Sequence, residues 1–559
     1  MLNKNDVIEV EIIDYGTNGE GVAKIDGFTI FVSGAIKDEV CKIVITKVLK
    51  THGFGKVIEI LKKSENRAEI DCKTYPRCGG CSLRHIKYQE TLNIKKEKVQ
   101  NLIERNVSKD LKVNDCVGME NPFYYRNKAI YPVTYDCHKN DMNRNCEKVN
   151  FKKIENANKK IIEFEKTSNI NEQKNLDYDL KNNSLIDSMC IKPGIYAKRS
   201  HVVIPFEECK IQTKISQEIA KYICENWEST IYNESLENDN ITKNDKINAT
   251  TENNTFKTVI SKGFSGNSIN NEKTKNNINI KNNNQGVLRN IMIREGFATG
   301  EILVTLVESK FVKDAIDIEK LTKTFPNIKT VVANINSKNT NVVLSDKNIV
   351  LYGNGFIYDK IGDYTFKISP NSFYQVNPAQ TKVIYETAIK EANLNKNDIL
   401  CDLYSGIGTI GIFASKYVKQ VYGIEIVSEA IKDANENAKL NGIQNIEFIE
   451  GDVETAFDSL LKNNVKPNAV IVDPPRRGLD GKTIQNLCKL NLEKLVYISC
   501  NPSTLARDLA ILQNSYCINS ITPIDNFPYS THVETVVSLT KKCWYNFILL
   551  TLIRYNVII

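Results

Sequence analysis

The sequence of 559 residues lacks three features that mark large classes of protein. No apolar run reaches the roughly 20 residues that a membrane-spanning helix needs, so we expect no membrane segment. Its start has no signal-peptide pattern, and its fifteen cysteines show no even spacing. Disulfide-stabilised secreted proteins usually have both. We therefore expect a cytoplasmic protein whose cysteines serve as thiols, metal ligands or a nucleophile.

The net charge is also small, +7, but it is unevenly distributed. Residues 72–132 contain twelve Lys or Arg and six Asp or Glu, a local excess of six positive charges. Such an excess fits a partner that carries phosphates, and it equally fits a solvated helix face.

Two segments differ in composition from the rest of the chain: 137–188 is rich in Asn, Lys and Glu, and 230–285 has sixteen Asn in fifty-six positions and few large apolar residues. Neither segment can bury enough surface to fold alone, so we expect both to be insertions. The end of the chain, 542–559, is apolar but short, and it is expected to be a packed or unstructured tail.

The length suggests about three domains. Residues 1–62 show short alternating strands at 7–12, 28–32, 40–45 and 55–60 with glycines between them, a pattern typical of a small closed β-barrel. Residues 63–365 are expected to form a central α+β domain. Its predicted elements are a helix at 88–105 and strands at 194–196, 291–294 and 301–307. A third domain is expected at 366–541.

The third domain is organised around the sequence CDLYSGIG at 401–408. A buried strand precedes this stretch and a helix begins after it, and seventeen residues beyond Gly408 a second strand ends at Glu425. A glycine turn between strand and helix lets backbone approach a ligand, and a following acid can bind ribose hydroxyls. This context favours a nucleoside cofactor over an ordinary tight turn.

Further strands are predicted at 447–449, 469–472 and 495–499, and a helix at about 379–392. Alternating strands and helices indicate an α/β fold with a doubly wound parallel sheet, in which ligands bind at the carboxyl ends of the strands. The residues expected to gather at that edge are Gly406, Glu425, Asp452, Asp473 and Cys500.

A thiol beside a nucleoside cofactor suggests covalent catalysis by Cys500. Attack requires the thiolate, so we expect the surroundings of Cys500 to lower its pKa. His532 and Glu534 come later in the sequence and could move a proton at the same edge. For His532 a structural hydrogen bond is the preferred interpretation.

Three cysteines cluster early in the sequence, Cys72, Cys78 and Cys81. Zinc or an iron–sulfur centre would fit three such thiolates, and either needs a fourth ligand, for which we favour Cys209. Three free buried cysteines are the alternative. The other residues considered as ligands are Cys116, Cys190, Cys224 and His85, the last of these expected to be structural.

Two aromatic residues stand beside two cations in the sequence YYRNK at 124–128. Stacking combined with phosphate contact is how unpaired RNA is usually held, although an ordinary strand with surface cations has the same pattern.

Taken together, these motifs resemble those of the RNA uracil-C5 methyltransferase family. The matching stretches are Cys72 with CGGC at 78–81, FYQVN at 373–377, DLYSGIG at 402–408, DPPR at 473–476, SCNP at 499–502 and HVET at 532–535. The residues GEGVAK at 19–24 and VSGA at 32–35 resemble a TRAM domain, an RNA-binding barrel. The departures from the family pattern are the two Asn-rich insertions and the tail.

The resemblance implies a TRAM, OB-like barrel, a central domain and a Rossmann-like methyltransferase domain. It implies a [4Fe-4S] cluster held by Cys72, Cys78, Cys81 and Cys209. Residues Gln375, Tyr404, Gly406, Glu425 and Asp473 would bind S-adenosylmethionine. Cys500 would be the nucleophile and Glu534 the general base.

The substrate implied by the resemblance is a uridine of RNA, with 23S ribosomal RNA favoured over transfer RNA. No obligate protein partner is evident. Two rival functions remain. One is methylation of cytosine C5 or of an exocyclic nitrogen, and the other is a non-catalytic RNA-binding or assembly factor.

Overall fold

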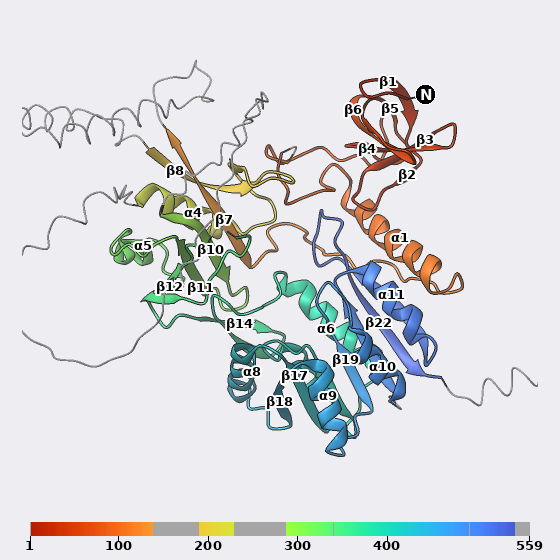
Figure 1. Ribbon diagram of the computed structural model, residues 1–559. Helices are drawn as coiled ribbons and strands as arrows, with labels where there is room; N and C mark the ends of the chain where they lie inside the picture. Colours follow the sequence, from red (N-terminus) through yellow and green to blue (C-terminus); the bar gives the residue numbers. More distant parts are fainter. Residues whose placement is uncertain are drawn as a thin grey trace, which may run out of the picture.

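The computed structural model describes residues 2–75, 77–137, 189–227, 287–338, 340–490 and 492–542 (Figure 1). The segments expected to be insertions, at 137–188 and 230–285, and the tail at 542–559 lie almost wholly outside these residues. Within the described part of the chain, no helix combines the length and the apolar character that crossing a membrane requires.

The first unit is the expected small barrel, drawn in red in Figure 1. Its sheet has the order β1-β5-β6-β4-β3-β2, and the Ile13 N–H donates to the Val22 carbonyl (2.8 Å), which joins β1 back to β3. The predicted strands are present, but β2 and β3 were not predicted as strands. The strands are β1 (Val7–Glu11), β2 (Asp14–Tyr15), β3 (Gly21–Ile25), β4 (Phe28–Ser33), β5 (Val40–Val48) and β6 (His52–Lys62).

The central unit is a seven-stranded sheet in the order β13-β12-β11-β10-β7-β8-β9, in which only β11 and β12 are parallel. Helices α4 (Lys214–Asn226) and α5 (Ile318–Thr324) accompany it. A hairpin of β14 (Ile357–Ile361) and β15 (Tyr364–Ile368) follows. The central strands are β7 (Lys128–Cys137), β8 (Met189–Tyr196), β9 (Val203–Pro205), β10 (Leu288–Glu295), β11 (Ile302–Glu308), β12 (Ile328–Ile335) and β13 (Asn348–Tyr352).

The third unit is a seven-stranded sheet in the order β18-β17-β16-β19-β20-β22-β21 (teal to blue in Figure 1). The elements alternate as predicted, and the predicted strand at 469–472 matches β19 in full. The strands are β16 (Ile399–Leu403), β17 (Gln420–Glu425), β18 (Ile446–Glu450), β19 (Ala469–Val472), β20 (Lys494–Ser499), β21 (Tyr516–Ile524) and β22 (Glu534–Lys541).

One strand departs from the predicted parallel sheet. β22 is antiparallel to both of its neighbours, β20 and β21. It follows β21 through a short loop without a helix, and such a connection suits antiparallel strands. Because β22 runs in reverse, its first residue, Glu534, lies at the edge where the parallel strands end.

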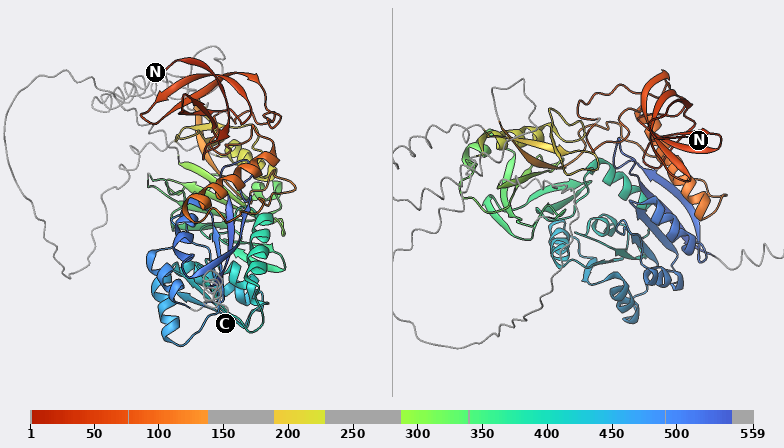
Figure 2. Two further views of the ribbon diagram at one scale, coloured as in Figure 1. Left: turned by 90° about the vertical axis from the view of Figure 1, so that its right-hand side faces the viewer. Right: turned by 45° about the horizontal axis from the view of Figure 1, so that its top comes forward.

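Successive residues of the strands point to opposite faces, and each face is covered by helices (Figure 2). One face packs against α9 (Val453–Lys462), α10 (Gly481–Lys489) and α11 (Pro502–Leu512), and the other against α6 (Pro378–Ala392), α7 (Thr409–Ser415) and α8 (Ser428–Leu440). Helix α1 (Tyr88–Asn106) adds Leu92, Val99 and Ile103 to the first face. The helix that follows the barrel in the chain therefore shares the core of this sheet, and the central unit reaches the opposite face through Leu303 and the β14–β15 hairpin.

Candidate active site at the carboxyl edge of the third sheet

The loop after β16 has an unusual backbone. Tyr404, Gly406 and Gly408 all have positive φ, of 69°, 55° and 80°. Only glycine adopts this region freely, and a tyrosine there stores strain, which is typical of functional sites. A Cβ at Gly408 would lie 2.5 Å from the Phe448 ring, so this position also requires glycine for close packing. The backbone is thus shaped for close approach of a ligand.

Glu425, at the end of β17, is fixed against this loop. Its Oε2 accepts from the Gly406 N–H (3.0 Å), and its Oε1 accepts from the N–H groups of Ile426 (2.9 Å) and Val427 (3.0 Å). The carboxylate is held at the mouth of the loop with lone pairs left for a ligand. This geometry suits recognition of two neighbouring hydroxyls.

Asp473 follows β19 directly, and its N–H donates to the Leu403 carbonyl (3.3 Å). Burial raises its pKa to about 7. The Tyr404 hydroxyl donates to Asp480 (3.5 Å) from the far side of the loop. The predicted edge residues Gly406, Glu425, Asp452, Asp473 and Cys500 therefore follow five neighbouring strands at one edge of the sheet.

Gln375 reaches the third unit from a different direction, the loop between β15 and α6. Its carbonyl accepts from the Asn127 amide (3.0 Å), and the Asn127 N–H donates to the neighbouring Val376 carbonyl (3.0 Å). No hydrogen bond of the Gln375 side chain to another described residue is present. The structure thus places Gln375 at the junction with the central unit, and its link to the cofactor stays a prediction.

Cys500 and Glu534 face one another across the ends of β20 and β22. The last pair in the antiparallel register is Ser499 with Thr535, so Cys500 and Glu534 stand one step beyond it. Their mutual electrostatic influence is direct, because the Glu534 carboxyl raises the pKa of the Cys500 thiol. The two predicted catalytic residues therefore lie together.

The pKa of the Cys500 thiol is raised to about 11, so the prediction of a lowered pKa is wrong for the ligand-free protein. Burial is the largest cause, followed by the negative charges of Glu534 and Asp473, and only Arg476 opposes them electrostatically. Glu534 is buried, and its pKa is raised to about 8 by burial and by Asp473. The site favours neutral forms of both groups.

Two further groups that affect this pair were not predicted as site residues. Asn526 and Arg476 both lower the pKa of Glu534, Asn526 through its side-chain amide and Arg476 through its charge. Arg476 follows Asp473 in the DPPR motif, which was a usable signal. Asn526 lies outside the motifs, in the loop before HVET at 532–535, so no sequence signal pointed to it.

His532 does not form the expected structural hydrogen bond. Its ring packs against Phe527, with the ring centroids 6.0 Å apart, and no hydrogen bond of the imidazole to a described residue is present. Burial of the ring nitrogens and four nearby cations lower its pKa, led by Arg476 and Lys98. The charged groups that affect it most are thus all basic.

The four predicted ligand cysteines Cys72, Cys78, Cys81 and Cys209 line one cavity of about 300 Å³ between the central sheet and the preceding loop. Of the competing cysteines, Cys116 and Cys224 lie in other apolar cores, and the side chain of Cys190 is outside the description. His85 is buried with its Nδ1 hydrogen-bonded to the Tyr75 hydroxyl (2.6 Å). It does not line the cavity.

The chemistry of this cavity suits an anionic group. The Gly80 N–H donates to the Cys78 sulfur (3.2 Å), and Arg84 and Arg126 line the cavity with Arg84 Nη1 and Arg126 Nε buried and without hydrogen-bond partners. However, no three Cys, His, Asp or Glu side chains of the described residues stand close enough together to hold a single metal ion. Metal binding is therefore not shown.

Of the two tyrosines predicted to stack on RNA bases, only Tyr124 has an accessible ring. Tyr125 is 4% exposed and cannot stack on a base. Tyr124 is partly exposed, with φ of 52°, and Lys214 lies 5.3 Å above its ring. A stacked aromatic and a cation remain at this position.

Comparisons with known proteins agree with this architecture. Residues 264–542 match the family model of tRNA (uracil-5-)-methyltransferases, and residues 2–58 match the TRAM domain. A protein of Halalkalibacterium halodurans, named as an uncharacterized RNA methyltransferase, is 35% identical over 97% of this chain and 98% of its own length. A similarly named protein of Clostridium acetobutylicum is 36% identical over 97% and 98%.

Among solved structures, a Pyrococcus abyssi tRNA (uracil-54, C5)-methyltransferase in complex with S-adenosyl-L-homocysteine matches with a TM-score of 0.60. The match covers 95% of this chain and 99% of that protein at 22% identity, and it confirms the predicted fold. With relatives this similar over nearly their whole length, the chain belongs to the tRNA (uracil-5-)-methyltransferase family of RNA methyltransferases and carries a TRAM domain at residues 2–58.

Proposed function

We propose that the protein transfers a methyl group from S-adenosylmethionine to C5 of a uridine in RNA through a covalent bond to Cys500. The observation that carries this proposal is the opposition of Cys500 and Glu534 at the end of two neighbouring strands, beside the glycine loop. Exocyclic nitrogens need no covalent activation of the ring, so a thiol at this position favours carbon methylation.

Cys500 and Glu534 would act at different steps of the reaction, Cys500 first and Glu534 last. Uracil C5 is a weak nucleophile, and addition of the Cys500 thiolate to C6 pushes electrons toward the C4 carbonyl and makes C5 enolate-like. S-adenosylmethionine, when bound, supplies the electrophilic methyl group. Glu534 then takes the proton from C5, and the electrons of that C–H bond expel the Cys500 sulfur from C6.

The raised pKa values of Cys500 and Glu534 imply that the RNA-free site is held neutral. Glu534 gives up its proton more readily than Cys500, and Arg476 is the cation that lowers the pKa of both groups. We infer that bound RNA and cofactor redistribute charge at this edge, so that the thiolate forms only in the complete complex. A base stacked in RNA cannot reach the edge and must be flipped out.

The cofactor would lie along the glycine loop. Gly406 offers close backbone approach, Glu425 binds the ribose hydroxyls, and Tyr404 and Asp473 flank the loop on either side. Gln375 would enter from the junction with the central unit. The support is the convergence of strand ends, since each residue except Gln375 ends a strand of one sheet or follows it within three residues.

We further propose that Cys72, Cys78, Cys81 and Cys209 hold a [4Fe-4S] cluster. The support is their shared cavity, the N–H group aimed at the Cys78 sulfur and the two arginines with unpartnered buried nitrogens. A cluster is larger than one ion, so its ligands need not meet the closer spacing of a single metal. It would organise this loop and take no part in methyl transfer.

The substrate we favour is 23S ribosomal RNA, with transfer RNA as the alternative. The test uses protein purified without oxygen, methyl-labelled S-adenosylmethionine and each unmodified RNA in turn, with the labelled nucleoside identified by mass. Labelled 5-methyluridine in ribosomal RNA supports the full proposal. Labelled 5-methyluridine in transfer RNA alone would mean that transfer RNA, and not ribosomal RNA, is the substrate. A labelled methylcytosine would overturn the uridine assignment.

The competing function is a non-catalytic RNA-binding factor with an intact fold. RNA containing 5-fluorouracil separates the two, because fluorine at C5 cannot be removed as a proton and the Cys500 adduct is trapped. A protein–RNA species that survives denaturation supports the enzyme. Tight binding with neither an adduct nor methyl transfer would support the factor.

A further inference from the structure

The loop that carries Glu534 into the site is closed at its base. Ile524, at the end of β21, pairs with Glu534, at the start of β22, so residues 525–533 leave and return at one point. Near the tip, Tyr529 has φ of 61°, a conformation that a tyrosine holds only when its surroundings impose it. The position of Glu534 therefore depends on what fixes this loop.

Most of the loop's backbone is held by side chains and N–H groups from outside the sheet. The partners come from the start of α6, from α1 and from the segments around residues 82 and 125. The carbonyls that accept are those of Asp525 (from Gln380, 3.1 Å), Asn526 (from Asn377, 3.1 Å), Phe527 (from Lys95, 3.0 Å), Pro528 (from Tyr125, 3.5 Å), Tyr529 (from Ser82 and Leu83, 2.9 Å each) and Thr531 (from Lys98, 2.8 Å).

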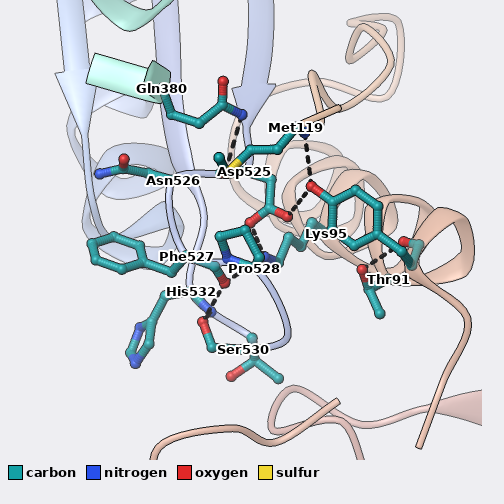
Figure 3. Close-up of polar contacts among 12 residues, drawn as sticks. Thr91, Lys95, Met119, Gln380, Asp525, Asn526, Phe527, Pro528, Ser530 and His532 are labelled. Carbon is teal, nitrogen blue, oxygen red and sulfur yellow. Dashed lines mark hydrogen bonds and ion pairs between the residues drawn. The ribbon is translucent and has the colours of Figure 1, made fainter. Parts of the chain in front are cut away.

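The centre of this arrangement is an ion pair between Lys95 and Asp525, in which both side chains are 0% exposed. Figure 3 shows the Asp525 carboxylate directed at Lys95 on helix α1. The second carboxylate oxygen accepts from the Tyr88 hydroxyl (2.8 Å), and the Asp525 N–H donates to the Val117 carbonyl (2.9 Å). Every polar group of the aspartate is thus committed.

A buried ion pair of this kind is weak evidence for stability, since desolvation of both charges offsets their attraction. Its distinctive property is geometric, because a buried charge is stable only beside its oppositely charged partner, and this requirement fixes where each side chain lies. Lys95 binds both Asp525 and the Phe527 carbonyl, so it fixes two points of the loop from one helix position. Asn526, between these two points, is one of the groups that lower the pKa of the Glu534 carboxyl, and its side-chain amide is buried without a hydrogen-bond partner.

We propose that Lys95 and Asp525 are positioning residues for proton removal by Glu534. Helix α1 holds the loop through them and so places the base relative to Cys500. The inference rests on the proposed function, and it adds that a residue some 430 positions away in the chain sets the geometry of the final chemical step.

The test is the double variant Lys95→Met, Asp525→Asn, which removes both charges, keeps the volumes and preserves an acceptor for Tyr88. Misplacement of about 1 Å is expected to lower kcat on the order of 100-fold, with binding of S-adenosylmethionine and RNA unchanged. Since Cys500 acts before Glu534, the methylated protein–RNA adduct should accumulate with ordinary uridine RNA, and a denaturing gel detects it.

The matched control is Lys96→Met, Asp115→Asn, which removes a neighbouring ion pair of the same helix (2.6 Å) whose side chains are 37% and 94% exposed. It should turn over like the wild type. Should the buried double variant fail to fold, Lys98→Met is the alternative. It removes the hydrogen bond from the half-buried Lys98 side chain to the Thr531 carbonyl, and the methylated protein–RNA adduct should again accumulate, but less of it.

Normal turnover by the buried variant, or a loss in which no adduct accumulates, would overturn the positioning role while an active wild type keeps the proposed function. Absence of 5-methyluridine from the wild type itself would instead reject the proposed function.

Discussion

Cys500 is the residue on which the covalent route depends. Cys500→Ala removes the nucleophile and leaves the glycine loop and Glu425 untouched, so methyl transfer should fall by several orders of magnitude while S-adenosylmethionine still binds. Filter assays of methyl transfer and calorimetric titration of the cofactor measure the two properties. Cys517→Ala, at an exposed position on β21, is the control and should be fully active. Normal turnover without Cys500 would exclude the adduct.

Glu534 should set the pH dependence. Its carboxyl must be ionised to accept a proton, and its pKa is raised from 4.5 to about 8 by burial and by Asp473, against the effects of Asn526 and Arg476. We therefore expect kcat/KM to rise with pH through about 8 in the wild type. Glu534→Gln should lose most activity and with it this rising limb. A profile that is flat between about pH 6 and pH 9 would contradict the assignment.

The same shift predicts how the protein's stability responds to pH. The carboxyl of Glu534 is neutral in the fold and has an ordinary pKa of 4.5 when unfolded. Its stabilising contribution is complete below that ordinary value and is lost as pH rises through about 8. In thermal unfolding without ligands, Glu534→Gln should therefore lose less stability than the wild type on going from acidic to alkaline pH.

At the scale of elements, Gly423 of β17 and Gly408 after β16 both pack against the Phe448 ring of β18, and there is no room there for an added side-chain atom. A Cβ at Gly423 would lie 2.5 Å from the Phe448 ring, which also lies against Gly408. Gly423→Ala should displace Phe448 toward the glycine loop and weaken S-adenosylmethionine binding, on the order of 10-fold for an overpacking cost of 1–3 kcal/mol. Gly481→Ala, where the space is open, should leave affinity unchanged.

Much of this element level could be predicted from the sequence, because β16, β19 and β20 are largely buried and mostly apolar runs followed by polar residues. The reversed direction of β22 could not be predicted, since periodicity reports which side chains are buried but not the direction of a strand. The same limit hid β3, whose residues Gly21, Val22 and Ala23 are all buried and show no alternation.

At the level of the site, Cys500, Glu425 and Asp473 could be named in advance because each ends or directly follows a strand, and Glu534 because it lies in the HVET motif that carries the family resemblance. Lys95 could not, since its contacts with the loop before β22 join segments about 430 positions apart. The raised pKa of Cys500 was also beyond reach, because it depends on how deeply two carboxyls and a thiol are buried together.

At the scale of the whole molecule, the cysteine cavity joins segments that are otherwise separate, the loop at 72–84, the end of β8 and the segment around Cys209. If it holds the proposed cluster, anaerobically purified protein should contain about four iron atoms per chain. Cys209→Ser should lower both the iron content and the unfolding temperature, whereas Cys517→Ser should lower neither. Iron-free wild type with full stability would reject the cluster.

The place of β22 in the sheet also bears on how the protein is made. β22 is the last described strand in the chain, yet it lies between β20 and β21, and the loop before it is anchored to residues about 430 positions earlier. A chain emerging from the ribosome can complete its barrel early, but its third sheet stays open until this strand is synthesised. Contacts this distant in sequence form slowly. The third sheet is therefore completed only after nearly the whole of the printed sequence has been translated, so a prematurely terminated product can carry a folded TRAM domain while lacking β22 and Glu534.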